Sequence, residues 1–94
     1  MNDILSITKS AMIRRPEGWN IGEVVNCDTL DDISTHLWLH DIEHDYTSDN
    51  DGQVRELLIY VYEDTLDKLL EHYVIDLDEY NELYQTDVDI IELV

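Results

Sequence analysis

Basic residues are scarce in this chain, since five Lys and Arg stand against 23 Asp and Glu among its 94 residues. The formal net charge is therefore −18 at pH 7. Lys9, Arg14 and Arg15 precede residue 16, so residues 16–94 carry 22 acids and only two bases. A surface this negative repels phosphates, which argues against direct binding to nucleic acid or to an anionic membrane.

Cysteine pairs and long apolar runs are also absent. A single cysteine, Cys27, excludes an internal disulfide bond. No apolar run approaches the length of a transmembrane helix, and no basic segment followed by an apolar one marks a signal peptide. We therefore expect a soluble, intracellular protein.

Motifs of enzymes are missing as well. The chain has no Gly-rich phosphate loop and no Gly-x-Ser-x-Gly sequence, and Cys27 lies in no nucleophile motif. Close carboxylate pairs arise by chance among 23 acids, so they select no acid–base dyad. We expect no enzymatic activity and no cofactor.

The apolar content shows that the chain folds. Apolar residues make up 44% of it, including two Trp and six Tyr, whereas charged disordered chains are poor in such residues. The length fits one domain. We expect a single acidic domain over residues 16–94, preceded by residues 1–15 as a basic arm or as the first element of the fold.

The central segment decides the fold class. Apolar or aromatic residues and histidines alternate with acids from Trp38 to Tyr46, residues 47–52 are rich in turn formers, and branched and aromatic residues fill 54–62. This pattern predicts an antiparallel β-hairpin. The alternative is one long helix over 54–74, because the apolar residues there also follow helical spacing.

Capping and turn signals divide the rest of the chain. They predict a strand over Trp19–Cys27, a helix from Thr29 to about Leu37, a helix from Asp64 through Tyr73, a helix opened by the Asp76 and Glu79 capping box, and a strand over Val88–Val94. The predicted fold class is a small single-domain α+β fold with a central antiparallel β-hairpin and two or three short helices. The alternative is an all-α bundle.

Two patterns suggest metal binding. His36, His40 and His44 recur every fourth residue and would share one face of a helix, but they diverge in the predicted strand. Asp49 to Gly52 is similar to the middle of a calcium loop whose end positions are not matched. We predict no metal site, and the sequence leaves the role of the histidines open.

The acidity itself is the strongest functional signal. A net charge with a magnitude of about 2–8 keeps a small domain soluble, so −18 calls for another explanation. Acids spaced i, i+2 on a strand lie about 6.6 Å apart, and acids spaced i, i+4 on a helix lie about 5–6 Å apart, so both form rows of anions. The candidate partner-binding residues are Asp41, Glu43, Asp45, Asp49, Asp51, Glu63, Asp64, Asp67, Glu71, Asp76, Asp78, Glu79 and Glu82.

The small size, the acidity and the Asp/Tyr-rich texture, as in residues 28–32 and 60–67, resemble those of DNA-mimic antagonists. Phages and mobile elements use such proteins against restriction enzymes and CRISPR effectors. The class has no common fold or motif, and the resemblance covers residues 16–94. It implies an inhibitor in the cytoplasm of a bacterial host cell that blocks the DNA-binding surface of a basic nucleic-acid-binding protein.

The alternative function is an immunity protein or antitoxin that neutralises a basic nuclease toxin. In both functions, acidic side chains of this protein bind basic side chains of its partner. A mimic competes with DNA, whereas a neutraliser is free to bind beside the active site of its toxin. A second copy of the chain, in a homodimer, is a further candidate partner.

We predict that the purified protein does not bind duplex DNA, even at low salt, where charge effects are strongest. The mobility of a labelled duplex in a native gel should stay unchanged with the protein in large excess. A basic DNA-binding protein run alongside serves as the positive control. A retarded band without any basic partner would contradict this expectation.

Overall fold

The computed structural model describes residues 9–15, 19–21, 25–27 and 29–94. Its elements are β1 (Ser10–Ile13), β2 (Trp19–Ile21), β3 (Val25–Cys27), α1 (Leu30–Leu39), β4 (His44–Ser48), β5 (Val54–Tyr60), α2 (Thr65–Glu71), α3 (Leu77–Thr86) and β6 (Ile90–Leu93). The predicted α+β fold class is confirmed, and the all-α alternative is wrong.

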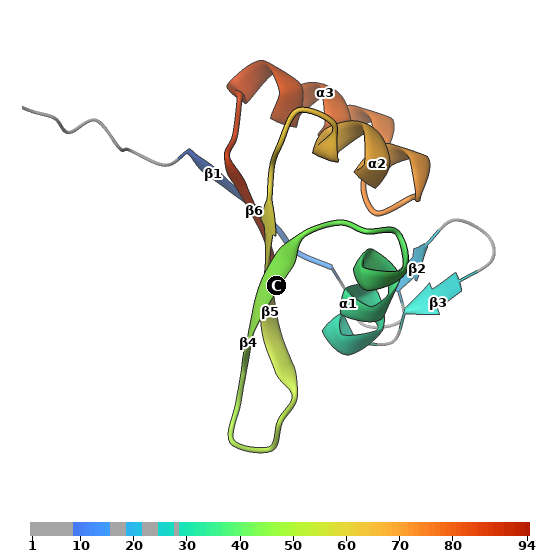
Figure 1. Cartoon of the computed structure of the whole chain (residues 1–94), viewed down its shortest axis with the longest axis vertical. Helices are drawn as coiled ribbons and strands as arrows, with labels where there is room; N and C mark the ends of the chain where they lie inside the picture. Colours follow the sequence, from blue (N-terminus) through green and yellow to red (C-terminus); the bar gives the residue numbers. More distant parts are fainter. Residues whose placement is uncertain (1–8, 16–18, 22–24, 28) are drawn as a thin grey trace, which may run out of the picture.

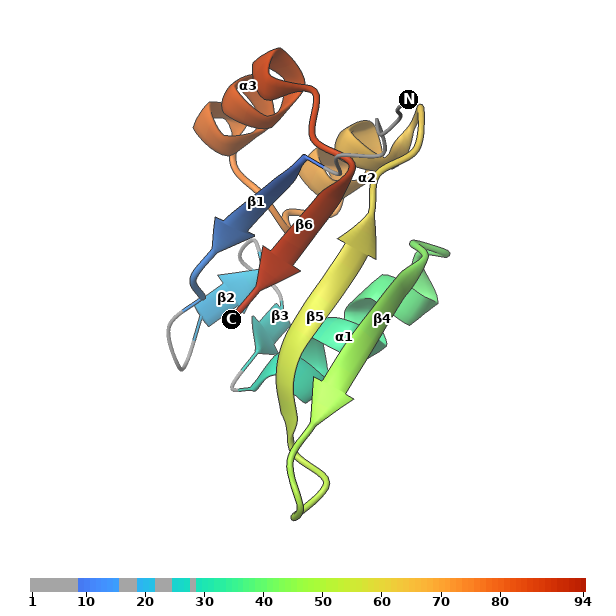
Figure 2. The same ribbon diagram turned by 90° about the vertical axis from the view of Figure 1, so that its left-hand side faces the viewer.

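The main sheet has the strand order β1-β6-β5-β4. The last strand, β6, lies between the first strand, with which it is parallel, and β5, with which it is antiparallel. Strands β2 and β3 form a separate antiparallel pair. Figures 1 and 2 show the helices and this small pair on one side of the main sheet, and no described element covers the opposite face.

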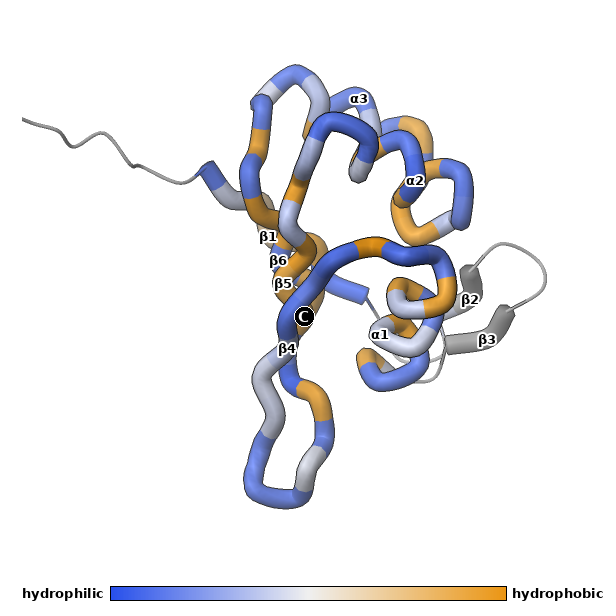
Figure 3. The backbone as a smooth tube through the Cα atoms, in the orientation of Figure 1, coloured by the Kyte–Doolittle hydropathy of each residue, from blue (hydrophilic) through white to orange (hydrophobic). Residues whose placement is uncertain are grey.

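The core lies between that sheet and the helices. Leu57 and Ile59 of β5 and Ile91 and Leu93 of β6 are each 0% exposed. They alternate with outward-facing residues, as a sheet with one buried face requires. Figure 3 shows the apolar segments gathered where the strands meet the helices, while the end of the β4–β5 hairpin is hydrophilic. Burial of each such side chain stabilises the fold by about 1.5–3 kcal/mol.

The predicted hairpin is confirmed, but its first strand begins later than expected. Helix α1 ends at Leu39 with His40 as its C-cap, Asp41 follows with a positive φ of 60°, and β4 starts at His44. A capping box between Thr29 and Asp32 starts the helix, and its buried Ile33 and Leu37 hold it on the core. The helical contacts therefore override the alternating pattern at residues 38–42.

The tight turn of the hairpin is organised by Asp49. Its carboxylate accepts the backbone N–H groups of Asp51 and Gln53 at 2.9 and 3.0 Å, and Arg55 pairs with it at 2.7 Å. Gly52 has a φ of 83°, which favours glycine. These bonds lower the pKa of Asp49, chiefly through the N–H of Gln53. The segment similar to a calcium loop is thus a hydrogen-bonded turn.

Residues 54–74 divide into a strand and a helix, so the single long helix is wrong. Asp64 lies at the start of α2 but makes no capping bond. The hydroxyl of Thr65 instead accepts the N–H of Tyr62 at 2.8 Å. The capping box of Asp76 and Glu79 at the start of α3 is confirmed.

Of the two remaining predicted strands, the first differs from the prediction and the second is confirmed. The strand predicted over Trp19–Cys27 is two short strands, and residues 22–24 between them lie outside the described residues, as do Asp28 and residues 1–8. The C-terminal strand is confirmed as β6. No helix in the described ranges has the length and apolarity that crossing a membrane requires.

Arg15 connects the edge of the sheet to α3. Its side chain is 9% exposed, and its two terminal nitrogens donate to the carboxylate of Glu79 at 2.8 and 3.0 Å. It also donates to the carbonyl of Val74 at 2.6 Å and lies 4.4 Å from the centre of the Trp19 ring. A bidentate pair of this kind is among the stronger side-chain interactions. One of the few bases is therefore part of the protein interior.

We predict that Arg15→Ala lowers the free energy of unfolding by about 3 kcal/mol, because it removes the bidentate donor of the Glu79 carboxylate and the donor of the Val74 carbonyl. Arg14→Ala is the matched control, since Arg14 is exposed and should change stability by less than about 0.5 kcal/mol. Urea unfolding measures both. Equal, small losses in the two variants would show that the buried pair contributes little.

Candidate partner-binding surface

Neutral donors, rather than bases, hold several of the carboxylates. The hydroxyl of Tyr62 donates to Glu43, and the hydroxyl of Tyr60 donates to Asp45. The hydroxyl of Tyr80 donates to Asp67 at 2.6 Å. A phenol fixes the position of a carboxylate without cancelling its charge. The surface therefore stays anionic while these side chains are restrained.

The uncovered face of the main sheet carries a regular set of acids. Asp45 of β4 pairs with Leu58 of β5, and Leu58 pairs with Glu92 of β6, so the three lie in one row across the sheet. Glu56, two residues before Leu58, faces the same way. Diagonal neighbours on adjacent strands are about 7–8 Å apart, so Glu56 lies at this distance from both Asp45 and Glu92.

No base interrupts this face within the strands of the main sheet. Its outward-facing residues are Asp45, Thr47, Glu56, Leu58, Tyr60, Ile90, Glu92, Ser10 and Met12. Arg55 alternates to the other side of β5 and pairs with Asp49. We call Asp45, Glu56 and Glu92, together with Glu43 directly before β4, the acidic sheet face. It presents carboxylates at fixed spacing on a rigid support.

The predicted acids are distributed over several parts of the structure. Glu43 and Asp45 lie on the acidic sheet face, Asp41 in the turn after α1, Asp49 and Asp51 in the hairpin turn, Glu63 and Asp64 before α2, Asp67 and Glu71 on α2, Asp76 at the start of α3, and Asp78, Glu79 and Glu82 on α3. Asp41 is thus not on the strand face expected for it. Asp76 and Glu79 bond each other's backbone, and Glu79 also holds Arg15.

Four acids that the structure adds to these surfaces were missed from the sequence. Glu56 and Glu92 complete the acidic sheet face, and Asp87 and Asp89 lie beside α3 near Glu63 and Asp67. Alternation within the apolar run at 90–93 was a usable signal for Glu92. The pairing of β5 with β6 brings the two glutamates together, and no local pattern encodes that pairing.

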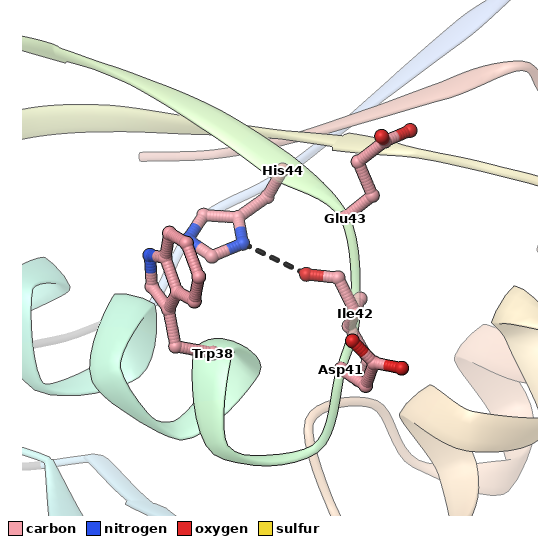
Figure 4. Close-up of a pocket in the computed structure, with 5 residues that line it drawn as sticks. All are labelled: Trp38, Asp41, Ile42, Glu43 and His44. Carbon is pink, nitrogen blue, oxygen red and sulfur yellow. Dashed lines mark hydrogen bonds between the residues drawn. The ribbon is translucent and has the colours of Figure 1, made fainter.

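A small pocket of about 260 Å³ lies where α1 leads into β4, lined by Trp38, Asp41, Ile42, Glu43 and His44 (Figure 4). The Trp38 ring, 74% exposed, packs edge-on against His44. Nδ1 of His44 donates to the Ile42 carbonyl at 2.9 Å, and Nε2 forms a hydrogen bond with the hydroxyl of Ser34 at 2.8 Å. The bond to Ser34 thus holds β4 to α1, and the bond to Ile42 holds the segment that connects them.

The other two histidines of the spaced set belong to a different cluster. His36 lies on α1 and His40 is its C-cap, with their ring centres 4.5 Å apart. The ring of His40 also stacks on that of His72, with ring centres 3.7 Å apart. Burial lowers the pKa of His40, and the neighbouring His72 and His36 lower it further. Nε2 of His36 donates to the His72 carbonyl. Within the described part of the chain, no three His, Cys, Asp or Glu side chains are placed to hold one metal ion.

The tyrosine–carboxylate bonds predict how stability depends on alkaline pH. The bond to the carboxylate raises the pKa of Tyr60, Tyr62 and Tyr80 above the usual 10.0. A group whose pKa is higher in the folded state stabilises the fold fully below its unfolded pKa and loses that contribution as the pH rises through the folded pKa.

We therefore expect the unfolding free energy to fall above pH 10 and to fall less in the triple variant Tyr60→Phe, Tyr62→Phe, Tyr80→Phe, which keeps the rings. Urea unfolding at a series of pH values measures the slopes. Asp78→Asn is the control, because no tyrosine hydroxyl bonds Asp78 among the described residues and the loss should stay as in the original chain. Identical slopes in the triple variant and the original chain would show that these bonds do not contribute.

Comparison of the chain with protein-family models, with curated proteins and with solved structures finds no match.

Proposed function

We propose that this protein is a DNA-mimic inhibitor that binds the DNA-contacting surface of a basic, nucleic-acid-binding protein. Restriction enzymes and CRISPR effectors are targets of this kind. The observation that carries the proposal is the acidic sheet face, on which uncharged hydroxyl groups rather than bases hold Glu43 and Asp45. A protein that binds phosphates through Lys and Arg would meet in it a second polyanion.

Two features of the face favour a specific partner over mere solubility. Tyr60 and Tyr62 restrain Asp45 and Glu43, so these acids lose little additional conformational freedom on binding. Leu58, Ile90 and the 65% exposed Met12 lie among the acids on the same face. An interface with apolar contacts inside a charged surround is typical of protein–protein recognition.

The inhibitor function is tested by competition with DNA. A bacterial lysate passed over the immobilised protein should yield a nucleic-acid-binding protein that a short DNA duplex elutes more efficiently than polyglutamate of equal charge. With that protein purified, binding should weaken steeply with salt, and duplex DNA should displace the complex. If DNA and this protein bind the target together with unchanged affinities, the DNA-mimic proposal is wrong. The alternative, a protein that neutralises a basic toxin, then takes its place.

The same assay locates the binding surface. The triple variant Asp45→Asn, Glu56→Gln, Glu92→Gln should raise the dissociation constant about tenfold, since surface ion pairs contribute about 0.2–1 kcal/mol each. The matched control Asp31→Asn, Asp51→Asn, Glu82→Gln removes the same charge from exposed positions elsewhere. An equal loss in the control would mean that total charge, and not the acidic sheet face, determines binding.

A further inference from the structure

A groove of about 470 Å³ is lined by the segment that leads from β5 into α2 and by the segment that leads from α3 into β6. Figure 1 shows these two segments at one end of the sheet. Its size is within the range of about 300–1,000 Å³ typical of ligand clefts. Leu66, Leu83 and Val88 form an apolar floor, and the last two are 4% and 6% exposed. Asp45, Glu56 and Glu92 of the acidic sheet face do not line the groove, which adjoins that face at Tyr62, the residue that bonds Glu43.

The rim of the groove is acidic. The carboxylates of Glu63, Asp67, Asp87 and Asp89 surround the floor, all on exposed residues. Tyr80 bonds Asp67, and the N–H of Lys9 bonds Asp89, whereas neither Glu63 nor Asp87 pairs with a Lys or Arg among the described residues. No basic side chain of the described chain lines the groove.

Aromatic rings and a helix end add to this character. Tyr80 and Tyr84 stack with ring centres 6.0 Å apart, and Tyr62 and Tyr84 are 58% and 68% exposed. Helix α3 ends beside the groove at Asp87 and has no basic residue in its last turn. The C-terminal end of a helix carries a partial negative charge that attracts cations.

We propose that this groove receives an arginine side chain of a basic partner protein. Arginine matches both parts of the groove, because its aliphatic stem packs on an apolar floor while its guanidinium stays at a charged rim. A planar guanidinium stacks flat on an aromatic ring and pairs with a carboxylate through two parallel bonds, whereas a lysine ammonium binds both as a point charge, without this geometry. The inference rests on the proposed function only for the basic nature of the partner.

The test uses the whole chain and an acetylated hexa-arginine peptide at low salt, with binding followed by NMR. The largest shifts should fall on the rings of Tyr80 and Tyr84 and on the methyl groups of Val88. A hexa-lysine peptide of equal charge should bind more weakly by about 2- to 5-fold, the range of an exposed cation–ring contact. Equal affinity for the two peptides, or no binding of either, would overturn the proposal.

Variants separate the groove from general acidity. Glu63→Gln with Asp87→Asn should weaken peptide binding about 5-fold, and asparagine tolerates the positive φ of 53° at position 87. Tyr84→Leu should weaken it by a further factor of about 2 to 5. The control Asp31→Asn with Asp51→Asn loses the same charge at two positions that do not line the groove, the start of α1 and the hairpin turn, where the structure places the Asp51 named from the sequence. It should change the affinity less than about 2-fold. An equal loss of peptide affinity in the control would overturn the proposal that the groove binds arginine.

The outcome is independent of the proposed function. The peptide assay contains neither DNA nor a DNA-binding target. If this protein fails to compete with DNA for a target, the result of the peptide assay is therefore unaffected. The triple variant of the acidic sheet face removes one more charge than Glu63→Gln with Asp87→Asn, and it should still lose less peptide affinity than that groove variant. Loss of peptide binding in that variant, with the groove variant unchanged, would place the arginine site on the sheet instead.

Discussion

Repulsion among carboxylates is the constraint on which the rest of this structure depends. With five bases for 23 acids, the chain has too few cations to pair each carboxylate. It restrains many of them with uncharged donors instead, such as the hydroxyls of Tyr60 and Tyr62 and the backbone N–H groups around Asp49. The compact state then depends on a one-sided core, because each donor positions an acid without reducing the net charge.

That core also explains the division of the molecule into two faces. The helices bury one face of the sheet, and burial of Leu57, Ile59, Ile91 and Leu93 offsets the repulsion. The other face needs no packing partner, so its alternating positions accept Glu56 and Glu92. The same alternation that builds the core thus creates the surface that we propose for partner binding.

The bases are few, and one of them is structural. Arg15 links the end of β1 to Glu79 and Val74 and so fastens the edge of the sheet to α3. Strand β6 in turn lies between β1 and β5, which joins the two ends of the chain in one sheet. The groove that we propose for arginine differs from this pair, because acids line it and no basic side chain of the described residues does.

The sequence by itself determined the charge, the α+β class, the hairpin and the capping box of Asp76, because each depends on composition or on residues a few positions apart. The tertiary structure decided where α1 ends, since burial of Ile33 and Leu37 outweighs the alternation at residues 38–42. It also decided which acids act together. Glu56 and Glu92 become neighbours on one face only through the pairing of β5 with β6. Glu63 and Asp87 line one groove only through the packing of α2 against α3. Such long-range contacts leave no periodic pattern in a single sequence.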